Sequence, residues 1–356
     1  MSSSHLFDPE FAELADLGWT PALAEAFERV AVSDVRPGRI ARVDHGRSTV
    51  LVPHPVRARN QLHLVTAGDW VALGPSQTGP DRFEVTAVLP RHSAFNRLQV
   101  GHTQAQAVAA NLDVVLIAAS LDRELNLRSL ERYLVMGWES GATPVVVLTK
   151  ADSRTKDAVD YAVGEARTVA LDAEVVAVSA ISGVGMAQLS GRFLRPGRTI
   201  GVVGPSGAGK STLVNWFIGS FEMATGPVRS DGKGRHTTSH RQLLVLPGRG
   251  ILLDTPGLRS LGLWLVSDGV DRAFADLAEL ATQCRFNDCG HTQEPGCRVL
   301  RAVSEGTISA ARLDAWRKLA REASSVAARQ GDLAEQRAQR QRWKALAREQ
   351  RRQPRS

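Results

Sequence analysis

Long hydrophobic runs are absent from this chain of 356 residues, and cysteine and the aromatic residues are scarce. A membrane-spanning helix takes about 20 consecutive apolar residues, and no run of that length occurs. Residues 1–11 are polar and acidic and lack the apolar centre of a signal peptide. These absences argue against a membrane protein and against a secreted one. We therefore expect a cytoplasmic protein that has no membrane partner.

The three cysteines all fall within one short stretch. An odd number of cysteines in a cytoplasmic chain argues against a disulfide framework and favours a metal site or a catalytic thiol. Cys284, Cys289 and Cys297 are accompanied by His291 in the pattern C-x4-C-x-H-x5-C. Four such ligands suit a closed, tetrahedral, structural zinc site with no position left for catalysis. The alternative is a set of free or buried thiols beside an unrelated histidine.

Positive charge exceeds negative charge, with 44 Lys and Arg against 37 Asp and Glu and a net charge of +7. Such an excess favours polyanionic partners, because neutralised phosphates release condensed counterions. From residue 331 onward, basic residues outnumber acidic ones, which is common in nucleic-acid-contacting tails and also in merely solvated ones. These basic residues are Arg337, Arg340, Arg342, Lys344, Arg348, Arg351, Arg352 and Arg355.

The patterned segments indicate several domains. Residues 1–35 have apolar spacings typical of a helical extension. Residues 36–98 contain short, alternating, valine-rich segments that predict a small β-barrel. Residues 99–270 alternate strand and helix patterns, which predicts an α/β domain with a mostly parallel sheet. After it we expect a helical, cysteine-containing domain over residues 271–320 and a basic helical tail over residues 321–356.

The strongest motif is a phosphate loop of the form G-x-x-x-x-G-K-[ST], which follows an apolar strand and enters a helix. Its glycines let the backbone wrap the phosphates closely, with amide N–H groups and the helix N-terminus facing the negative charge. Lys210 is expected to reach the β- and γ-phosphates, and Ser211 to bind Mg²⁺. The predicted nucleotide-binding residues of this loop are Gly204, Pro205, Ser206, Gly207, Ala208, Gly209, Lys210, Ser211 and Thr212.

A second phosphate-side motif, Asp254-Thr-Pro-Gly257, follows another apolar strand. An acid at such a strand end holds Mg²⁺ through water, and the amide of the following glycine can bond the γ-phosphate. Alone, D-x-P-G is more often only a turn. Its position about 45 residues after the phosphate loop favours the nucleotide role for Asp254 and Gly257.

Two motifs predict which base is bound. Thr149-Lys150-Ala151-Asp152 closes a valine-rich strand and matches [NT]-K-x-D, in which the Asp carboxylate accepts two hydrogen bonds from guanine. Adenine would leave that acid unpaired, which is costly in a buried site. Ser179 and Ala180 end the next strand and fit the second guanine-contact element. Together these motifs favour GTP and GDP as ligands.

The order of the motifs is unusual. Ordinary GTPases have the phosphate loop first and the base motifs last, whereas here Asp152 and Ser179 precede Gly204 and Asp254. A circular permutation gives this order when the original termini lie close together. It also joins the segment after Gly257 directly to the C-terminal region, so we hypothesise that the nucleotide state alters that region.

The first switch loop is expected at residues 232–238, Gly-Lys-Gly-Arg-His-Thr-Thr, where Thr237 or Thr238 would close on Mg²⁺. Leu258 stands where many GTPases carry the glutamine that orients the attacking water, so intrinsic hydrolysis should be slow. His236 is the candidate that replaces this glutamine, and the alternative is a solvated loop histidine. The predicted catalytic residues are therefore His236, Thr238 and Lys210.

The motifs T-K-A-D, S-A, G-P-S-G-A-G-K-S, G-R-H-T-T and D-T-P-G, in this order, resemble the ribosome small subunit-dependent GTPase A family. The preceding barrel and the following cysteine cluster are similar as well, so the resemblance covers about residues 36–315. It implies an OB-fold β-barrel, a circularly permuted P-loop GTPase domain and an α-helical zinc-binding domain. This chain has Ser239 where the family often has a further Thr, which leaves the Mg²⁺ ligand open between Thr237 and Thr238.

The resemblance also implies the partners: GTP and GDP, and the small (30S) ribosomal subunit, whose late maturation the enzyme assists and which stimulates hydrolysis. From the residues themselves, we expect both flanking domains to bind ribosomal RNA. The barrel has few aromatic residues (Trp70, Phe83 and Phe95), which favours recognition of backbone and shape over base stacking. We expect a monomer with one structural zinc ion and with Mg²⁺ bound together with GTP.

Two other classes of protein stay open on the sequence. One is a GTPase that acts elsewhere in translation or on the large ribosomal subunit. The other is a non-enzymatic RNA-binding protein that holds the nucleotide as a structural ligand. The intact Lys210, Ser211 and Asp254 argue against the second class, whereas Leu258 keeps it open.

Overall fold

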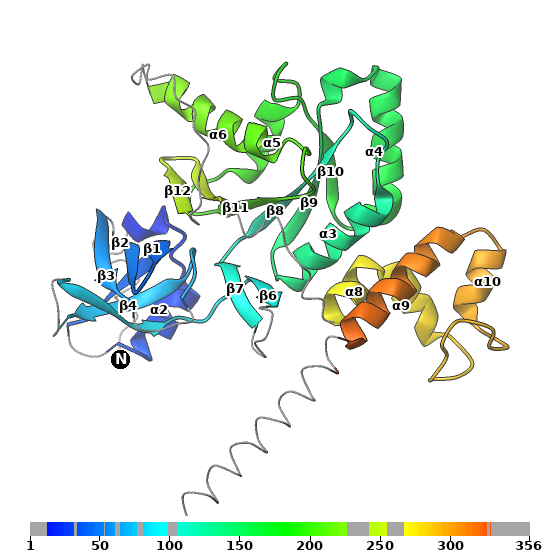
Figure 1. Ribbon diagram of the computed structural model, residues 1–356, viewed down its shortest axis with the longest axis horizontal. Helices are drawn as coiled ribbons and strands as arrows, with labels where there is room; N and C mark the ends of the chain where they lie inside the picture. The colour runs from blue at the N-terminus through cyan, green and yellow to red at the C-terminus, as the bar shows by residue number, and fades with distance from the viewer. Residues whose placement is uncertain are drawn as a thin grey trace, which may run out of the picture. The chain divides into compact units, whose positions relative to one another are not determined.

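The computed structural model describes residues 13–31, 34–52, 54–60, 65–76, 81–98, 105–225, 242–254, 267–325 and 328. The chain divides into two compact units, one formed by residues 1–96 and 107–262 and the other by residues 97–106 and 263–356. Within the described ranges, no helix has both the length and the apolar character that crossing a bilayer requires. Figure 1 shows the elements of both units.

The first unit begins with a helical segment. Residues 13–15 form a helical turn, and α2 spans Pro21–Glu28. Thr20 caps α2, because its hydroxyl accepts a hydrogen bond from the Leu23 amide at 3.3 Å. The apolar positions of this segment are buried against the barrel, where the ring centroids of Trp19 and Trp70 lie 4.8 Å apart. Of the predicted extension over residues 1–35, the structure thus describes one helical turn and the helix α2.

Five described strands form the small barrel: β1 (Arg36–Asp44), β2 (Arg47–Val52), β3 (His54–Arg59), β4 (Trp70–Pro75) and β5 (Phe83–Val88). They close on themselves, because β1 pairs with β2 and β4, and β5 pairs with β3 and β4. Alternate apolar side chains, such as Ile40, Val50 and Val71, fill the interior. The predicted barrel is confirmed.

The α/β part contains the parallel strands β8 (Val114–Ser120), β9 (Thr143–Thr149), β10 (Glu174–Ala177), β11 (Thr199–Val203) and β13 (Gly250–Asp254), in the order β10-β9-β8-β11-β13. On one face lie α5 (Met186–Phe193) and α6 (Lys210–Thr225), whose side chains share a core with β8, β9 and β11. On the other face lie α3 (Leu127–Glu139) and α4 (Lys156–Ala170) (Figure 1). The predicted α/β domain is thus confirmed.

The barrel and the α/β part share one sheet. The strand β12 (Gln242–Leu246) pairs antiparallel with β13 and, through Gln242, with Arg42 of β1. The described strands therefore form an 11-stranded sheet that runs from β10 into the barrel. Along β12, Leu244 packs on the α/β core and Val245 on the cluster of the N-terminal segment. The sequence patterns did not predict this continuity.

A separate two-stranded sheet is formed by β6 (Ala94–Leu98) and β7 (Ala105–Ala110). The second unit contains α8 (Ser267–Ala273), α9 (Ala275–Thr282), α10 (Arg298–Ser304) and a helix at residues 310–325. Arg312 fixes that last helix, because its guanidinium bonds both carboxylate oxygens of Asp276 at 2.7 and 2.8 Å and the carbonyl of Ala273 at 3.1 Å.

Candidate nucleotide site and metal centre

The predicted phosphate loop joins β11 to α6, as the sequence pattern requires. At Gly204 the backbone φ is +136°, and a Cβ atom there would lie 2.3 Å from the carbonyl oxygen of Ala118 in β8. At Gly209 φ is +80°, and a Cβ atom would lie 3.2 Å from the hydroxyl of Thr149. Glycine is therefore required at both positions by conformation and by close packing against the neighbouring strands.

Lys210 lies at the first position of α6 and is 9% exposed. Its ammonium group donates to the carbonyl oxygens of Gly204 at 2.7 Å and Pro205 at 2.6 Å. The charge is thus held against the loop itself, at the place where a P-loop lysine meets the nucleotide phosphates. The next two side chains, Ser211 and Thr212, are exposed at the open end of the helix.

Thr149 connects the predicted base motif to the phosphate loop. Its hydroxyl donates to the carbonyl oxygen of Ala208 at 2.8 Å, although the two residues are 59 positions apart in the chain. Ser179 is fully buried at the end of β10, and its hydroxyl accepts from the Ser182 amide at 3.1 Å. Both motifs therefore follow neighbouring parallel strands and lie at the same edge of the sheet.

Lys150 adopts a left-handed backbone conformation with φ of +58°, and its ammonium group bonds Asp122 Oδ2 at 2.6 Å. The Ser120 hydroxyl donates to the other oxygen of Asp122 at 2.7 Å. These hydrogen bonds, first that from Lys150 and then that from Ser120, hold the pKa of Asp122 below its ordinary value. Asp122 therefore stays a carboxylate and fixes the position of the Lys150 side chain.

Asp122 and Arg123 were missed by the sequence analysis. A Cβ atom at Gly207 would lie 2.8 Å from the guanidinium of Arg123, so this side chain touches the phosphate loop. The signal that could have found both residues is their position directly after β8, which lies between the strands of the base motif and the phosphate loop. Residues that follow adjacent parallel strands meet at one sheet edge.

The remaining predicted residues are placed only in part. Asp152 is exposed directly after β9, Ala180 is half-buried after β10, and Asp254 ends β13 beside β11. The other predicted residues lie outside the described part of the chain. These are His236, Thr237, Thr238, Gly257 and Leu258.

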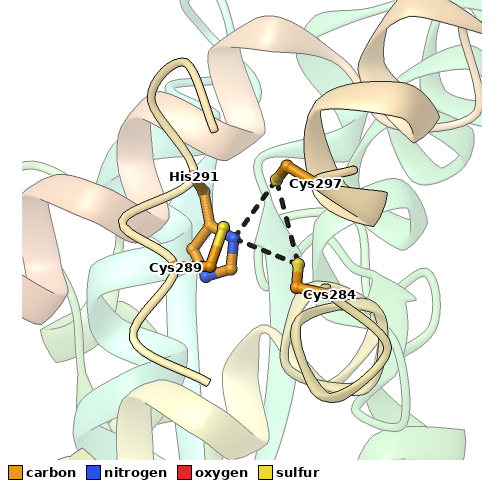
Figure 2. Close-up of side chains that lie close together, drawn as sticks. All are labelled: Cys284, Cys289, His291 and Cys297. Atoms are coloured by element: carbon orange, nitrogen blue, oxygen red, sulfur yellow. Dashed lines mark hydrogen bonds between the residues drawn. The ribbon is translucent and has the colours of Figure 1, made fainter. Parts of the chain in front are cut away.

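The predicted metal ligands do come together. The ligand atoms of Cys284, Cys289, His291 and Cys297 all lie within 4.8 Å of one another (Figure 2). Cys284 follows α9, and Cys297 caps α10, its sulfur accepting from the Leu300 amide at 3.4 Å. Among the described residues they form a possible metal-binding site.

The distances test whether zinc fits these ligands. Two sulfurs bound to one tetrahedral zinc at about 2.3 Å lie about 3.8 Å apart, and a sulfur and a nitrogen lie about 3.5 Å apart. The sulfurs of Cys284 and Cys297 are 3.8 Å apart, and His291 Nδ1 is 3.6 Å from the first and 3.4 Å from the second. Burial lowers the pKa of His291, which favours the neutral imidazole that a metal requires. These spacings fit a structural zinc ion bound through Nδ1.

Comparison with known proteins gives a consistent result. Residues 88–264 match the family model described as RsgA GTPase. The small ribosomal subunit biogenesis GTPase RsgA of Streptomyces coelicolor is 44% identical over 340 residues, which cover 92% of this chain and 90% of that protein. The protein of the same name from Opitutus terrae is 41% identical over 361 residues, covering 94% of this chain and 95% of its own.

Solved structures are similar in fold. The crystal structure of YjeQ from Thermotoga maritima matches with a TM-score of 0.62 at 24% identity and covers 81% of this chain and 98% of its own. The structure of YloQ, described as a circularly permuted GTPase, matches with a TM-score of 0.59 at 21% identity and covers 82% and 96%. The circularly permuted GTPase fold predicted from the order of the motifs is therefore a known one.

Proposed function

Since the chain belongs to the RsgA GTPase family, we propose that it hydrolyses GTP while bound to the small ribosomal subunit and assists the late maturation of that subunit. The relatives carry the role in small-subunit biogenesis in their names. A factor with this role works in the cytoplasm, and one copy of the chain suffices for one subunit. GDP and phosphate are the products.

One observation supports this function above the others. The hydrogen bond from the Thr149 hydroxyl to the Ala208 carbonyl, 2.8 Å long, joins the base motif to the phosphate loop. The two motifs stand in the reverse of their usual order, and yet the fold brings them to one edge of the sheet. A GTP molecule whose guanine lies at Asp152 and Ser179 can therefore place its phosphates at Gly209 and Lys210.

In the proposed reaction, the Lys210 ammonium group leaves the carbonyl oxygens of Gly204 and Pro205 and bonds the β- and γ-phosphates instead. There it neutralises the charge that develops on the phosphates. Ser211, one of Thr237 and Thr238, and Asp254 through water would hold the Mg²⁺ that shields the same charge. Leu258 cannot orient a water molecule, so we assign that step to His236. We infer that contact with the bound subunit positions this imidazole for the reaction, which makes turnover dependent on the partner.

The barrel offers a surface for ribosomal RNA. On the outward face of β2 and β3, Arg47 is paired across the strands with Arg59, and Thr49 with Arg57. The alternate residues of both strands, such as Val50 and Ala58, are buried in the barrel. We call Arg47, Arg57 and Arg59 the arginine face. Adjacent guanidinium groups of this kind bind phosphates, and they provide affinity rather than base specificity.

Replacing Arg57 with alanine should weaken binding to small subunits and lower the slope of log K against log salt concentration by about 1, because one phosphate contact is lost. Arg57 is exposed, so the barrel should keep its stability. Binding measured at four salt concentrations gives the slope. Arg167→Ala, an exposed position on α4, is the matched control. Equal slopes for the two variants would exclude the arginine face from the contact.

The central test is GTP turnover by the full chain, alone and with purified small or large ribosomal subunits. We expect small subunits alone to raise kcat, by about two orders of magnitude or more. His236→Ala should remove this stimulation while leaving GDP affinity unchanged, and Lys210→Ala should abolish turnover. Equal stimulation by large subunits, or none by either, would overturn the proposed function. Stimulation that survives in His236→Ala would overturn only the role of that histidine.

A further inference from the structure

The helix at residues 310–325 contacts the metal centre at His291. The indole ring of Trp316 lies against the imidazole of His291, with ring centroids 5.1 Å apart and planes inclined by 38°. From the next position, the guanidinium of Arg317 donates a hydrogen bond to the His291 carbonyl oxygen. Both contacts go to the one ligand that is not a cysteine.

His291 is also the ligand whose backbone most needs support. Its φ of +56° lies in the left-handed region, which is strained for a non-glycine residue. The Glu294 carboxylate accepts hydrogen bonds from the amide of Gly290, which precedes His291, and from those of Thr292 and Gln293, which follow it, at 2.9, 2.7 and 2.9 Å. From the helix, Arg317 holds the His291 carbonyl. The loop that carries His291 is therefore held both by its own Glu294 and by Arg317 of the helix.

The ring orientation matters as much as the backbone. Nδ1 of His291 faces the sulfurs of Cys284 and Cys297, at 3.6 and 3.4 Å (Figure 2). A turn of the imidazole about its χ angles would remove the nitrogen from the ligand set. The face of Trp316 restricts tilting of the imidazole plane, because a tilt would lose part of the contact between the two rings.

From these contacts we propose that Trp316 and Arg317 are positioning residues for the metal centre: they preset His291 so that Nδ1 completes a site with the three thiolates. This inference rests on the metal centre proposed above and adds two residues that are not ligands. Outer contacts of this kind orient a ligand before the metal arrives, and their loss typically lowers metal affinity by about 10- to 100-fold.

The helix itself does not depend on these two contacts. Arg312 fixes it through Asp276 and Ala273, while Leu313 and Leu319 are buried. Trp316 and Arg317 are only partly buried. Their replacement should therefore leave the helix in place and change the histidine alone, which allows the positioning role to be tested separately from folding.

The experiment is a zinc-affinity measurement on the full-length protein, made by competition with a chromophoric chelator. We expect Trp316→Ala and Arg317→Ala each to bind zinc 10- to 100-fold more weakly than the unaltered chain. Trp316→Phe, which keeps an aromatic face, should restore most of the affinity. Lys318→Ala is the matched control, because this neighbouring side chain is exposed on the same helix.

Cobalt substitution separates positioning from general structural damage. In Trp316→Ala we expect the thiolate-to-Co²⁺ charge-transfer band to persist while the d–d bands shift, because three sulfurs still bind and the histidine is displaced. Unchanged zinc affinity in both alanine variants, or loss of the thiolate band together with the d–d bands, would overturn the inference. Should Trp316→Ala fail to fold, the spectrum and affinity of Arg317→Ala decide.

The outcome is distinguishable from a failure of the proposed function. GTP turnover stimulated by small subunits tests that function without reference to zinc affinity. If the unaltered chain binds no zinc, the metal centre and the positioning role both fail, whatever the GTPase result. If it binds zinc and the two alanine variants bind it equally well, only the positioning role fails.

Discussion

Asp152→Asn should lower the affinity for GTP by roughly three orders of magnitude and create affinity for xanthosine triphosphate. In the proposed guanine site, the Asp152 carboxylate would accept hydrogen bonds from two guanine N–H groups. The NH2 group of asparagine would face one of these guanine N–H groups, so a charge-assisted hydrogen bond is lost. The guanine N–H and the asparagine N–H that face each other are both left unpaired, at a cost of about 4 kcal/mol. Xanthine has a carbonyl oxygen where guanine has its exocyclic amine, so the asparagine NH2 group can donate a hydrogen bond to that oxygen.

Displacement of a fluorescent GDP analogue by GTP, XTP and ATP measures this change. Asp152 is exposed, so the substitution should leave the melting temperature unaltered. The control is Asp172→Asn, another exposed carboxylate in the α/β part, which should bind GTP as the unaltered chain does. A variant at Asp152 that still prefers GTP would show that another residue reads the base.

Arg39→Met should destabilise the first unit by about 3–5 kcal/mol. Arg39 is 1% exposed, and its guanidinium donates to the carbonyl oxygens of Leu17, Gly68 and Asn111, which belong to the N-terminal segment, the barrel and the strand connection before β8. Burial lowers its pKa to about 10, so the group is still charged at neutral pH. Methionine fills a similar volume but leaves these buried carbonyls without this donor.

Differential scanning calorimetry should show a midpoint lower by roughly 10 °C, the change expected for this loss of stability in a unit of this size. Arg42→Met provides the comparison on the same strand. The Arg42 side chain is 37% exposed and pairs with Asp44 at 2.8 Å, so its loss should cost less than about 1 kcal/mol. Equal midpoints for the two variants would mean that the three carbonyls find other donors.

The elements found from sequence were those whose pattern repeats locally. The apolar strand predicted directly before the phosphate loop is observed as β11, because its five consecutive residues are all buried and lead into the glycine-rich loop. By contrast, β3 was not located individually. Its sequence His-Pro-Val-Arg-Ala-Arg is mostly exposed and has one fully buried residue, Ala58, and its apolar alternation extends over only the four residues 56–59.

In the candidate site, too, the residues with a local sequence pattern were predicted, whereas those brought together by packing were not. Zinc ligands and the phosphate loop have fixed spacings in the chain, and these were predicted residue by residue. Asp122 and Trp316 act through residues 28 and 25 positions away, and only the packing of β8 on β9 and of a helix on the ligand loop brings them together. A sequence without relatives aligned to it contains no periodic signal for such pairs.

The pairing of β1 with β12 has a consequence for dissecting this protein. A β-strand at the edge of a sheet carries unpaired N–H and C=O groups, which recruit other strands and promote aggregation. In the intact chain the barrel covers β12 with one of its own strands, at Arg42 and Gln242. A truncated GTPase domain that begins after the barrel would therefore uncover this edge, together with the apolar side chain of Val245. The barrel thus protects the α/β domain from aggregation by keeping the edge of β12 paired.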